Sequence, residues 1–253
     1  MLKFFRRIRR KLLSESKFSK YLIYAIGEIL LVVIGILLAL QINNWNENRK
    51  NSILEKSYIK ELRADFKKDS IAIDKLLNDS NKQVSSKYKL QKFLKEYTDS
   101  KFNTSLKDYP AIARKVNYNK DSIYDYWVSQ WSQIYKFTPI TTTIDEMKST
   151  GKIGIITNKK LRQSIIETYN KYDYFLSYYQ ENYSTTLAEN RKMLLDDIPE
   201  LYLLSDESIL ELFQNKRVLN RFNANFVLTM NRGFIELQDV NLKLLNALNE
   251  WHD

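Results

Sequence analysis

The sequence predicts an all-α protein in which a single N-terminal transmembrane helix continues into an antiparallel bundle of long helices. An apolar segment near the N-terminus is long enough to cross a bilayer. No glycine or proline occurs from Ile36 to Tyr109, and apolar side chains in that stretch recur at three- and four-residue intervals. We therefore expect a basic cytoplasmic arm (1–20), a transmembrane helix (21–42) and a helical extracytoplasmic domain (43–253).

The predicted membrane helix is the segment Tyr21–Ile42. With a rise of about 1.5 Å per residue it reaches roughly 33 Å, and the hydrocarbon core of a bilayer is about 30 Å thick. The run from Ile29 to Leu40 is unbroken in apolar residues, and the single charge of the segment is Glu28. The lipid bilayer is therefore the first partner that the sequence predicts.

Positive charge is concentrated before this span. Residues 1–20 hold eight basic residues and one acidic residue, whereas the remaining chain has 32 basic and 29 acidic residues. A basic flank keeps the N-terminus in the cytoplasm and attracts anionic lipid headgroups, so we expect the C-terminal domain on the opposite side of the membrane. The span is longer than the apolar region of a secretory signal and no small-residue cleavage site follows it, which favours an uncleaved signal-anchor. The nearly balanced domain argues against a nucleic-acid partner.

The N-terminal block resembles a known family. The residues FFRRIRRKLLSESKFSKYLIYAIGEILLVVIGILLALQINNWNE are similar to the opening of an uncharacterised family of single-pass membrane proteins from Bacteroidota, a domain of unknown function. The pattern combines a basic arm, YAIGEI, a LVVIGI-type run and ALQINNWNE, and it covers Phe4 to Glu47. A looser match is TTTIDEMKSTGKIGIITNKKLRQSIIETYN, from Thr141 to Asn170. The resemblance implies a membrane location and a bacterial source, with no assigned activity. Together with the basic flank it leads us to expect a bacterial inner-membrane protein with a periplasmic C-terminal domain.

Small side chains recur along one stripe of the predicted membrane helix. Gly27, Gly35 and Ala39 share this stripe, and Glu28 borders it. Small residues let helices approach closely, and an acidic group inside a bilayer is stabilised by pairing or burial. One interpretation is self-association or docking to a partner membrane helix, with Glu28 hydrogen-bonded across the contact. The alternative is a lone span whose Glu28 extends to the cytoplasmic interface. Trp45 is expected at the outer interface, where an amphipathic indole is stable.

Helical periodicity continues beyond the membrane. The first helix is expected from about Asn44 to Tyr97, with a break near Asn78–Asn81 as the alternative, because those side chains compete with the backbone. Residues 98–121 are a polar connection with a short helix, and Asp121 is expected to cap a helix with an aromatic face that ends near Phe137.

The following block predicts a helix–turn–helix corner. Thr142 or Thr143 is expected to cap a short helix that Gly151 ends, and Asn158 to cap a helix running to about Leu195. Neither a GxGxxG nor a GK[ST] phosphate-binding motif is present. A short helix from about Asp206 and a last helix from near Lys216 complete the bundle, with Gly233 admitting a neighbouring helix.

An aromatic stripe follows Asn158. Tyr169, Tyr172, Phe175 and Tyr179 lie on or near one helical face. Such a row suits stacking on a carbohydrate or peptide ligand, although at this spacing it is more typical of a core with hydroxyls at its rim.

The sequence offers few groups for catalysis or metal binding. Cysteine is absent and the one histidine, His252, stands next to the C-terminus, so no ordinary zinc site or Ser-His-Asp triad is expected. Three acid pairs could in principle bind Ca²⁺ or act as acid and base: Asp65/Asp69, Asp145/Glu146 and Asp196/Asp197. We expect no catalytic residue, no cofactor and no metal ligand.

Three functions remain in order of preference. The first is a membrane-anchored, non-enzymatic interaction or scaffold protein of the bacterial envelope. The second is a sensor or ligand-binding module with an aromatic-lined pocket, and the third is a carboxylate-based envelope enzyme. A closed core around Trp127, Trp131, Tyr172 and Tyr179 would count against the second function.

Overall fold

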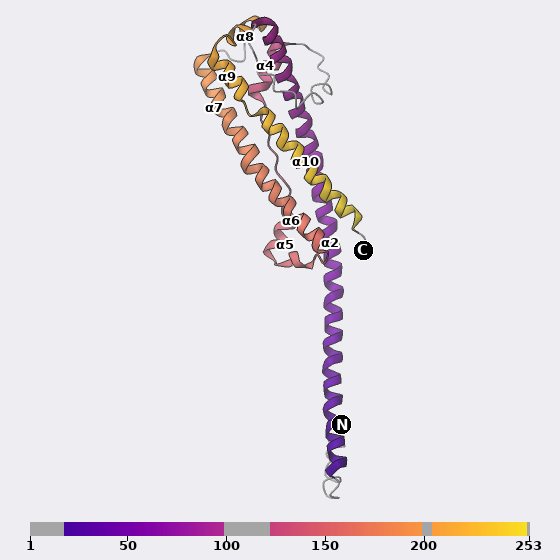
Figure 1. Ribbon diagram of the computed structural model, residues 1–253. Helices are drawn as coiled ribbons and strands as arrows, with labels where there is room; N and C mark the ends of the chain where they lie inside the picture. Colours follow the sequence, from indigo (N-terminus) through magenta and orange to yellow (C-terminus); the bar gives the residue numbers. More distant parts are fainter. Residues whose placement is uncertain (1–17, 99–121, 199–203, 252–253) are drawn as a thin grey trace. The chain divides into compact units, whose positions relative to one another are not determined.

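The structure, a computed structural model, describes residues 18–98, 122–198 and 204–251 (Figure 1). Every secondary-structure element of these residues is a helix, so the all-α prediction is confirmed. The predicted basic arm, most of the connection before Asp121, Asp121 itself and His252 lie outside the described residues. The chain forms two compact units, Met1–Ser57 and Tyr58–Asp253.

Helix α2 (Phe18–Thr98) contains the apolar segment of the first unit and the opening helix of the second. Among the described residues it is the one helix that is long and apolar enough to cross a membrane. The alternative break near Asn78–Asn81 is not formed. Ser80 and Asn81 instead accept hydrogen bonds from the side-chain amide of Asn231, at 3.0 and 2.9 Å, so these polar groups do not compete with the helical backbone.

Helix α4 (Ile123–Ser132) is shorter than predicted. Ser122 caps it by accepting a hydrogen bond from a backbone N–H of its first turn, and the expected continuation to Phe137 is wrong, because residues 133–141 have no regular secondary structure. The carbonyl of Gln133 accepts a hydrogen bond from the Tyr183 hydroxyl at 2.7 Å, and the N–H of Phe137 donates to the Gln180 side chain at 2.6 Å. Side chains from another helix thus replace the helical hydrogen bonds of this segment.

The predicted corner comprises α5 (Thr142–Ser149), the 3₁₀-helix η2 (Lys152–Ile155) and the start of α6 (Lys159–Tyr174). Gly151 ends α5 with a φ of 67°, and Asn158 caps α6 by accepting from the N–H of Leu161 at 3.1 Å. Both predictions are confirmed. The cap of α5 was wrongly predicted: Thr141 occupies that position and makes no side-chain capping bond.

The helix that begins at α6 continues through a π-helix, η3 (Phe175–Gln180), into α7 (Glu181–Asp197). The chain then forms α8 (Asp206–Leu212), α9 (Lys216–Ala224) and α10 (Val227–Glu250). The predicted single last helix is therefore wrong. Asn225, between α9 and α10, has an extended backbone with ψ 143°, and its side-chain oxygen accepts a hydrogen bond from the ammonium of Lys87.

Side-chain contacts within the second unit define the direction of its helices. Asn231 and Asn241 of α10 bind Ser80 and Phe66 of α2, respectively, so α10 runs antiparallel to α2. Gln83 of α2 binds Tyr183 of α7, and the Phe66 ring packs on Tyr169 of α6, so α6–α7 runs in the same direction as α2. The connection at 133–141 makes this possible, because it returns the chain along α2 before α6 begins.

Two groups of aromatic side chains fill the core of this unit. One surrounds Trp127, whose ring centroid lies 5.3 Å from that of Trp131 and 5.4 Å from that of Phe213. The other joins rings from α2, the 133–141 connection, α6, η3 and α10: Phe66, Phe137, Tyr169, Tyr172, Phe175 and Phe234. Burial of this aromatic surface is the main force that holds the helices together.

Gly233 admits a neighbouring helix, as predicted. A Cβ at this position would lie 2.6 Å from Cγ of Tyr179 and 3.1 Å from Cε2 of Phe175. The absence of a side chain therefore sets the close approach of α10 to the π-helix η3.

Candidate functional site

The small residues of the predicted membrane helix lie in the first unit. Gly27, Gly35 and Ala39 are exposed in this chain and Glu28 is half-buried. A Cβ added at Gly27 or Gly35 would meet nothing within 4 Å, so the stripe is open to a second helix or to lipid. Trp45 follows three residues after Ile42 and is 65% exposed, which leaves its indole accessible to a membrane interface.

The aromatic stripe faces the interior of the second unit. Tyr169, Tyr172, Phe175 and Tyr179 are 4%, 0%, 2% and 7% exposed. The Tyr172 hydroxyl accepts a hydrogen bond from the Asn241 amide at 2.6 Å, and the Tyr169 hydroxyl donates to the carbonyl of Ile140 at 3.1 Å. Trp127 and Trp131 are also fully buried. These side chains form a closed core, and Phe175 and Tyr179 alone among the four stripe residues line a hollow between α6, η3 and α10.

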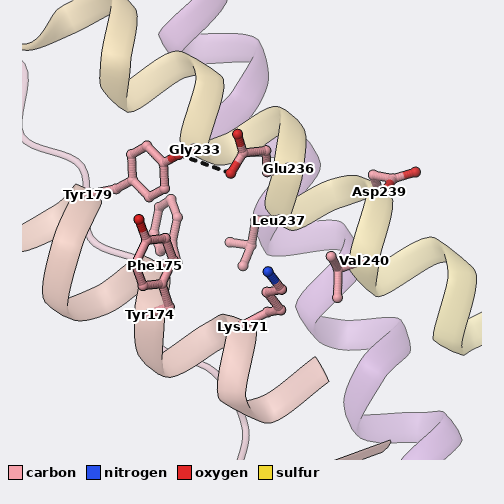
Figure 2. Close-up of a pocket in the computed structure, with 9 residues that line it drawn as sticks. All are labelled: Lys171, Tyr174, Phe175, Tyr179, Gly233, Glu236, Leu237, Asp239 and Val240. Carbon is pink, nitrogen blue, oxygen red and sulfur yellow. Dashed lines mark hydrogen bonds between the residues drawn. The ribbon is translucent and has the colours of Figure 1, made fainter. Parts of the chain in front are cut away.

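This hollow has a volume of about 200 Å³ (Figure 2). Its walls come from Lys171, Tyr174, Phe175, Tyr179, Gly233, Glu236, Leu237, Asp239 and Val240. Figure 2 shows the Tyr179 hydroxyl directed at Glu236 across its upper edge, with Lys171 below and Asp239 turned away. A second hollow of about 240 Å³ shares Lys171 and Val240 with the first. Pockets for small-molecule ligands usually measure about 300–1,000 Å³, so each hollow is of a size for one side chain or a small polar group.

The polar groups at the hollow are largely engaged with one another. The Tyr179 hydroxyl donates to Oε2 of Glu236 at 2.9 Å, and burial together with this acceptor raises the pKa of Tyr179 to about 12. Asp239 pairs with Lys243 at 2.7 Å. Tyr179 therefore stays a neutral donor at physiological pH, and it is a positioning group for Glu236.

A stacked pair of tyrosines beside the hollow was not predicted. Tyr174 and Tyr178 are 49% and 45% exposed, and their rings stack with centroids 5.3 Å apart at 8°. The pair lies at the π-helix, where the wider turn changes which residues face outward; π-helical turns frequently occur at functional sites. The tyrosine-rich sequence YDYFLSYYQ is the signal for aromatic surface here, but periodicity alone does not show which tyrosines of the run are exposed.

The predicted acid pairs have structural partners. Glu146 accepts from the Tyr58 hydroxyl at 2.8 Å, and Asp197 lies 3.6 Å from Arg217 on an exposed surface. Asp65 accepts from the Thr143 hydroxyl at 2.6 Å and Asp69 from the N–H of Ile140 at 3.1 Å. Within the described ranges no group of three or more His, Cys, Asp or Glu residues is arranged to hold a metal ion.

Lys87 is a buried cation that the sequence did not reveal. It is 1% exposed, and its ammonium donates to the carbonyl of Phe222 at 2.8 Å and to the side chain of Asn225. The carbonyls at the C-terminal end of α9 carry partial negative charge, which favours a cation there. Burial nevertheless lowers the pKa of Lys87 to about 7. The Lys87 side chain thus links α2 to the residues at the break between α9 and α10.

Comparison with known proteins identifies a family. Residues 28–194 match the family model described as a family of unknown function (DUF6090). No curated protein and no solved structure matches the chain. The matched range includes the last part of the N-terminal block, the corner and the aromatic stripe.

Proposed function

This chain belongs to the DUF6090 family of unknown function, and we propose that it is a membrane-anchored, non-enzymatic interaction or scaffold protein of the bacterial cell envelope. The observation that carries the proposal is the apolar surface of α2. The large apolar side chains between Leu22 and Ile42 are exposed, and a bilayer is the environment that covers such a surface.

Contact between membrane helices is the proposed mode of action within the bilayer. The open stripe of Gly27, Gly35 and Ala39 allows a second helix to approach closely, and Glu28 borders the stripe, where its carboxyl group can hydrogen-bond across that contact. The partner is a second copy of the chain or the membrane helix of another protein.

The proposed topology follows from charge. The basic arm remains in the cytoplasm, bound at anionic headgroups, and the helical unit lies in the periplasm of an inner-membrane protein. The resemblance of the N-terminal block also supports an origin in Bacteroidota. Protease added to spheroplasts should cut after Trp45, whereas full protection of the helical unit would invert this topology.

The contact is tested by crosslinking the full-length protein in native membranes. Glu28→Leu and Gly35→Leu should each abolish the crosslinked species that wild type forms. Val33→Leu is a matched control, because Val33 is 47% exposed and lies about 200° around the helix from Gly35. Unchanged crosslinking of both Glu28→Leu and Gly35→Leu would contradict the proposed contact.

A ligand-binding module is the second candidate. It is favoured by the exposed Tyr174–Tyr178 pair beside the hollow, because a tyrosine face can stack on a sugar ring or a peptide group. A thermal-shift screen with envelope saccharides and short peptides tests it, with Tyr174→Ala as the variant that should lose any shift. A hit that survives Tyr174→Ala would exclude this surface. A carboxylate-based enzyme remains the third candidate.

A further inference from the structure

Two carboxyl groups of α2 hold the corner of the second unit. Asp65 accepts the hydroxyl of Thr143 at 2.6 Å, and Asp69, one turn later, accepts the N–H of Ile140 at 3.1 Å through Oδ1. The corner is thus attached to α2 at the start of α5. The apolar face of α5, Ile144 and Met147, is buried when the corner is in place.

One oxygen of this clamp has no partner. Asp69 is 2% exposed, and its Oδ2 accepts no hydrogen bond. A buried carboxylate oxygen without a donor is strongly unfavourable when charged. A proton on this carboxyl removes the charge and leaves the other oxygen free to accept from Ile140.

The groups that face Asp69 do not compensate a negative charge. Asp65, on the same helix, adds a second carboxyl, and α6 presents the hydroxyls of Tyr169 and Tyr172. Asp145 of α5 and Lys148 also lie near Tyr169, with the Lys148 ammonium 5.9 Å from the ring centroid. From the connection the facing group is the backbone N–H of Ile140, and from α10 it is the uncharged Asn241, bound to Tyr172. No described basic side chain forms an ion pair with Asp69.

We propose that Asp69 is a proton-operated latch that holds the α5 corner against α2 when it is protonated and releases the corner more readily when it is ionised. Release hydrates the carboxylate, and water then screens its repulsion by Asp65, which stays one turn away on α2. It also uncovers Ile144 and Met147, so the latch controls exposure of an apolar surface. This inference does not depend on the proposed membrane contact.

The direction and size of the pH effect follow from linkage. Burial, with a smaller contribution from Asp65, raises the pKa of Asp69 to about 6 in the closed corner. In the released corner the carboxyl is in water and returns to an ordinary pKa of about 3.9. Between these two values the open form loses its proton first, so opening becomes more favourable as pH rises from about 4 to 6. A difference of about two units corresponds to a roughly 100-fold increase in the opening equilibrium constant.

Hydrogen–deuterium exchange of the full-length protein in nanodiscs tests the latch. Protection of the α5 amides, corrected for the intrinsic pH dependence of exchange, should fall by up to about 100-fold between pH 4 and pH 7, while amides of α4 stay constant. Asp69→Asn keeps an acceptor for Ile140 and should make protection of α5 independent of pH. Asp79→Asn, on the same helix at an exposed ion pair with Lys82, should retain the wild-type dependence.

A second variant keeps the proposal testable if Asp69→Asn does not fold. Asp65→Asn removes the neighbouring negative charge and should move the transition in α5 protection to lower pH. Protection of α5 that does not change with pH in wild type would overturn the latch. So would a dependence that survives in Asp69→Asn or does not move in Asp65→Asn.

Discussion

The substitution Gly233→Ala measures how tightly α10 packs on the π-helix. The added Cβ would lie 2.6 and 2.7 Å from two ring atoms of Tyr179 and 3.1 Å from Phe175. Both rings are buried, and the Tyr179 hydroxyl is bound to Glu236, so a shift of either ring into the neighbouring hollow disturbs packed contacts. Overpacking of this kind costs about 1–3 kcal/mol, and the better helix propensity of alanine returns about 1 kcal/mol. We therefore expect a net loss of up to about 2 kcal/mol, and of about 1 kcal/mol at the middle of this range.

The assay is thermal and urea unfolding of the full-length protein in detergent. For a unit of this size each kcal/mol of lost stability corresponds to a decrease in Tm of roughly 2–4 °C. Gly154→Ala is the matched control, because a Cβ there meets nothing within 4 Å. In a Tyr179→Leu background the loss caused by Gly233→Ala should shrink, because the nearest ring is gone. The packing argument fails if Gly233→Ala unfolds at or above the wild-type temperature.

Three further substitutions test single interactions of the second unit. Lys87 binds its proton more tightly in the unfolded chain than in the folded chain, so the free energy of unfolding should rise with pH between about 7 and 10. Lys87→Met should flatten this rise, whereas Lys75→Met on the exposed face of α2 should leave it unchanged. Asn158→Ala removes the cap of α6 and should cost about 1 kcal/mol in urea unfolding, and an equal loss from Asn170→Ala, at an exposed position inside α6, would refute a capping effect. Tyr179→Phe removes the donor to Glu236 and should cost about 1 kcal/mol, but no loss is expected in a Glu236→Leu background if that bond is the cause.

Local signals in the sequence predicted much of the fold. Gly151 marks the end of α5 because its positive φ suits glycine, and Asn158 marks the start of α6 because its side chain can satisfy a free N–H. Gly233 predicted the close approach of two helices. The roles of Gly151 and Asn158 depend on one residue and its nearby backbone, so one sequence is enough to find them, whereas Gly233 does not by itself identify the helix that approaches it.

Features that depend on distant side chains were missed. The end of α4 depends on Gln180 and Tyr183, which bind the backbone of the 133–141 connection. The break before α10 depends on Lys87, which binds Asn225 from a helix more than a hundred residues earlier in the chain. Helical periodicity contains no information about such partners, and it also does not show that α6–α7 runs in the same direction as α2.

The residues of the candidate site show the same difference between local signals and those that depend on distant residues. The open stripe of Gly27 and Gly35 was visible in the sequence because it needs no tertiary partner. The aromatic stripe was visible as a pattern, and the structure places its four members in the core, with the exposed Tyr174–Tyr178 pair as neighbours. Asp65 and Asp69 were visible as an acid pair, but the unpaired oxygen of Asp69 depends on where the fold places Ile140 and Thr143 against α2.

The π-helix η3 keeps the two ends of a long helix in phase. One residue more or less in a regular α-helix rotates everything beyond it by about 100°. A wider turn absorbs that rotation locally, so Tyr169 of α6 and Tyr183 of α7 both contact α2, even though Phe175, Tyr179, Tyr183 and Leu187 follow at repeated four-residue steps. If the same residues were wound as a regular α-helix, α7 would rotate by up to about 100° and the Tyr183 face would leave the core. The wider winding of this turn therefore keeps Tyr183 in the core together with Phe175 and Tyr179.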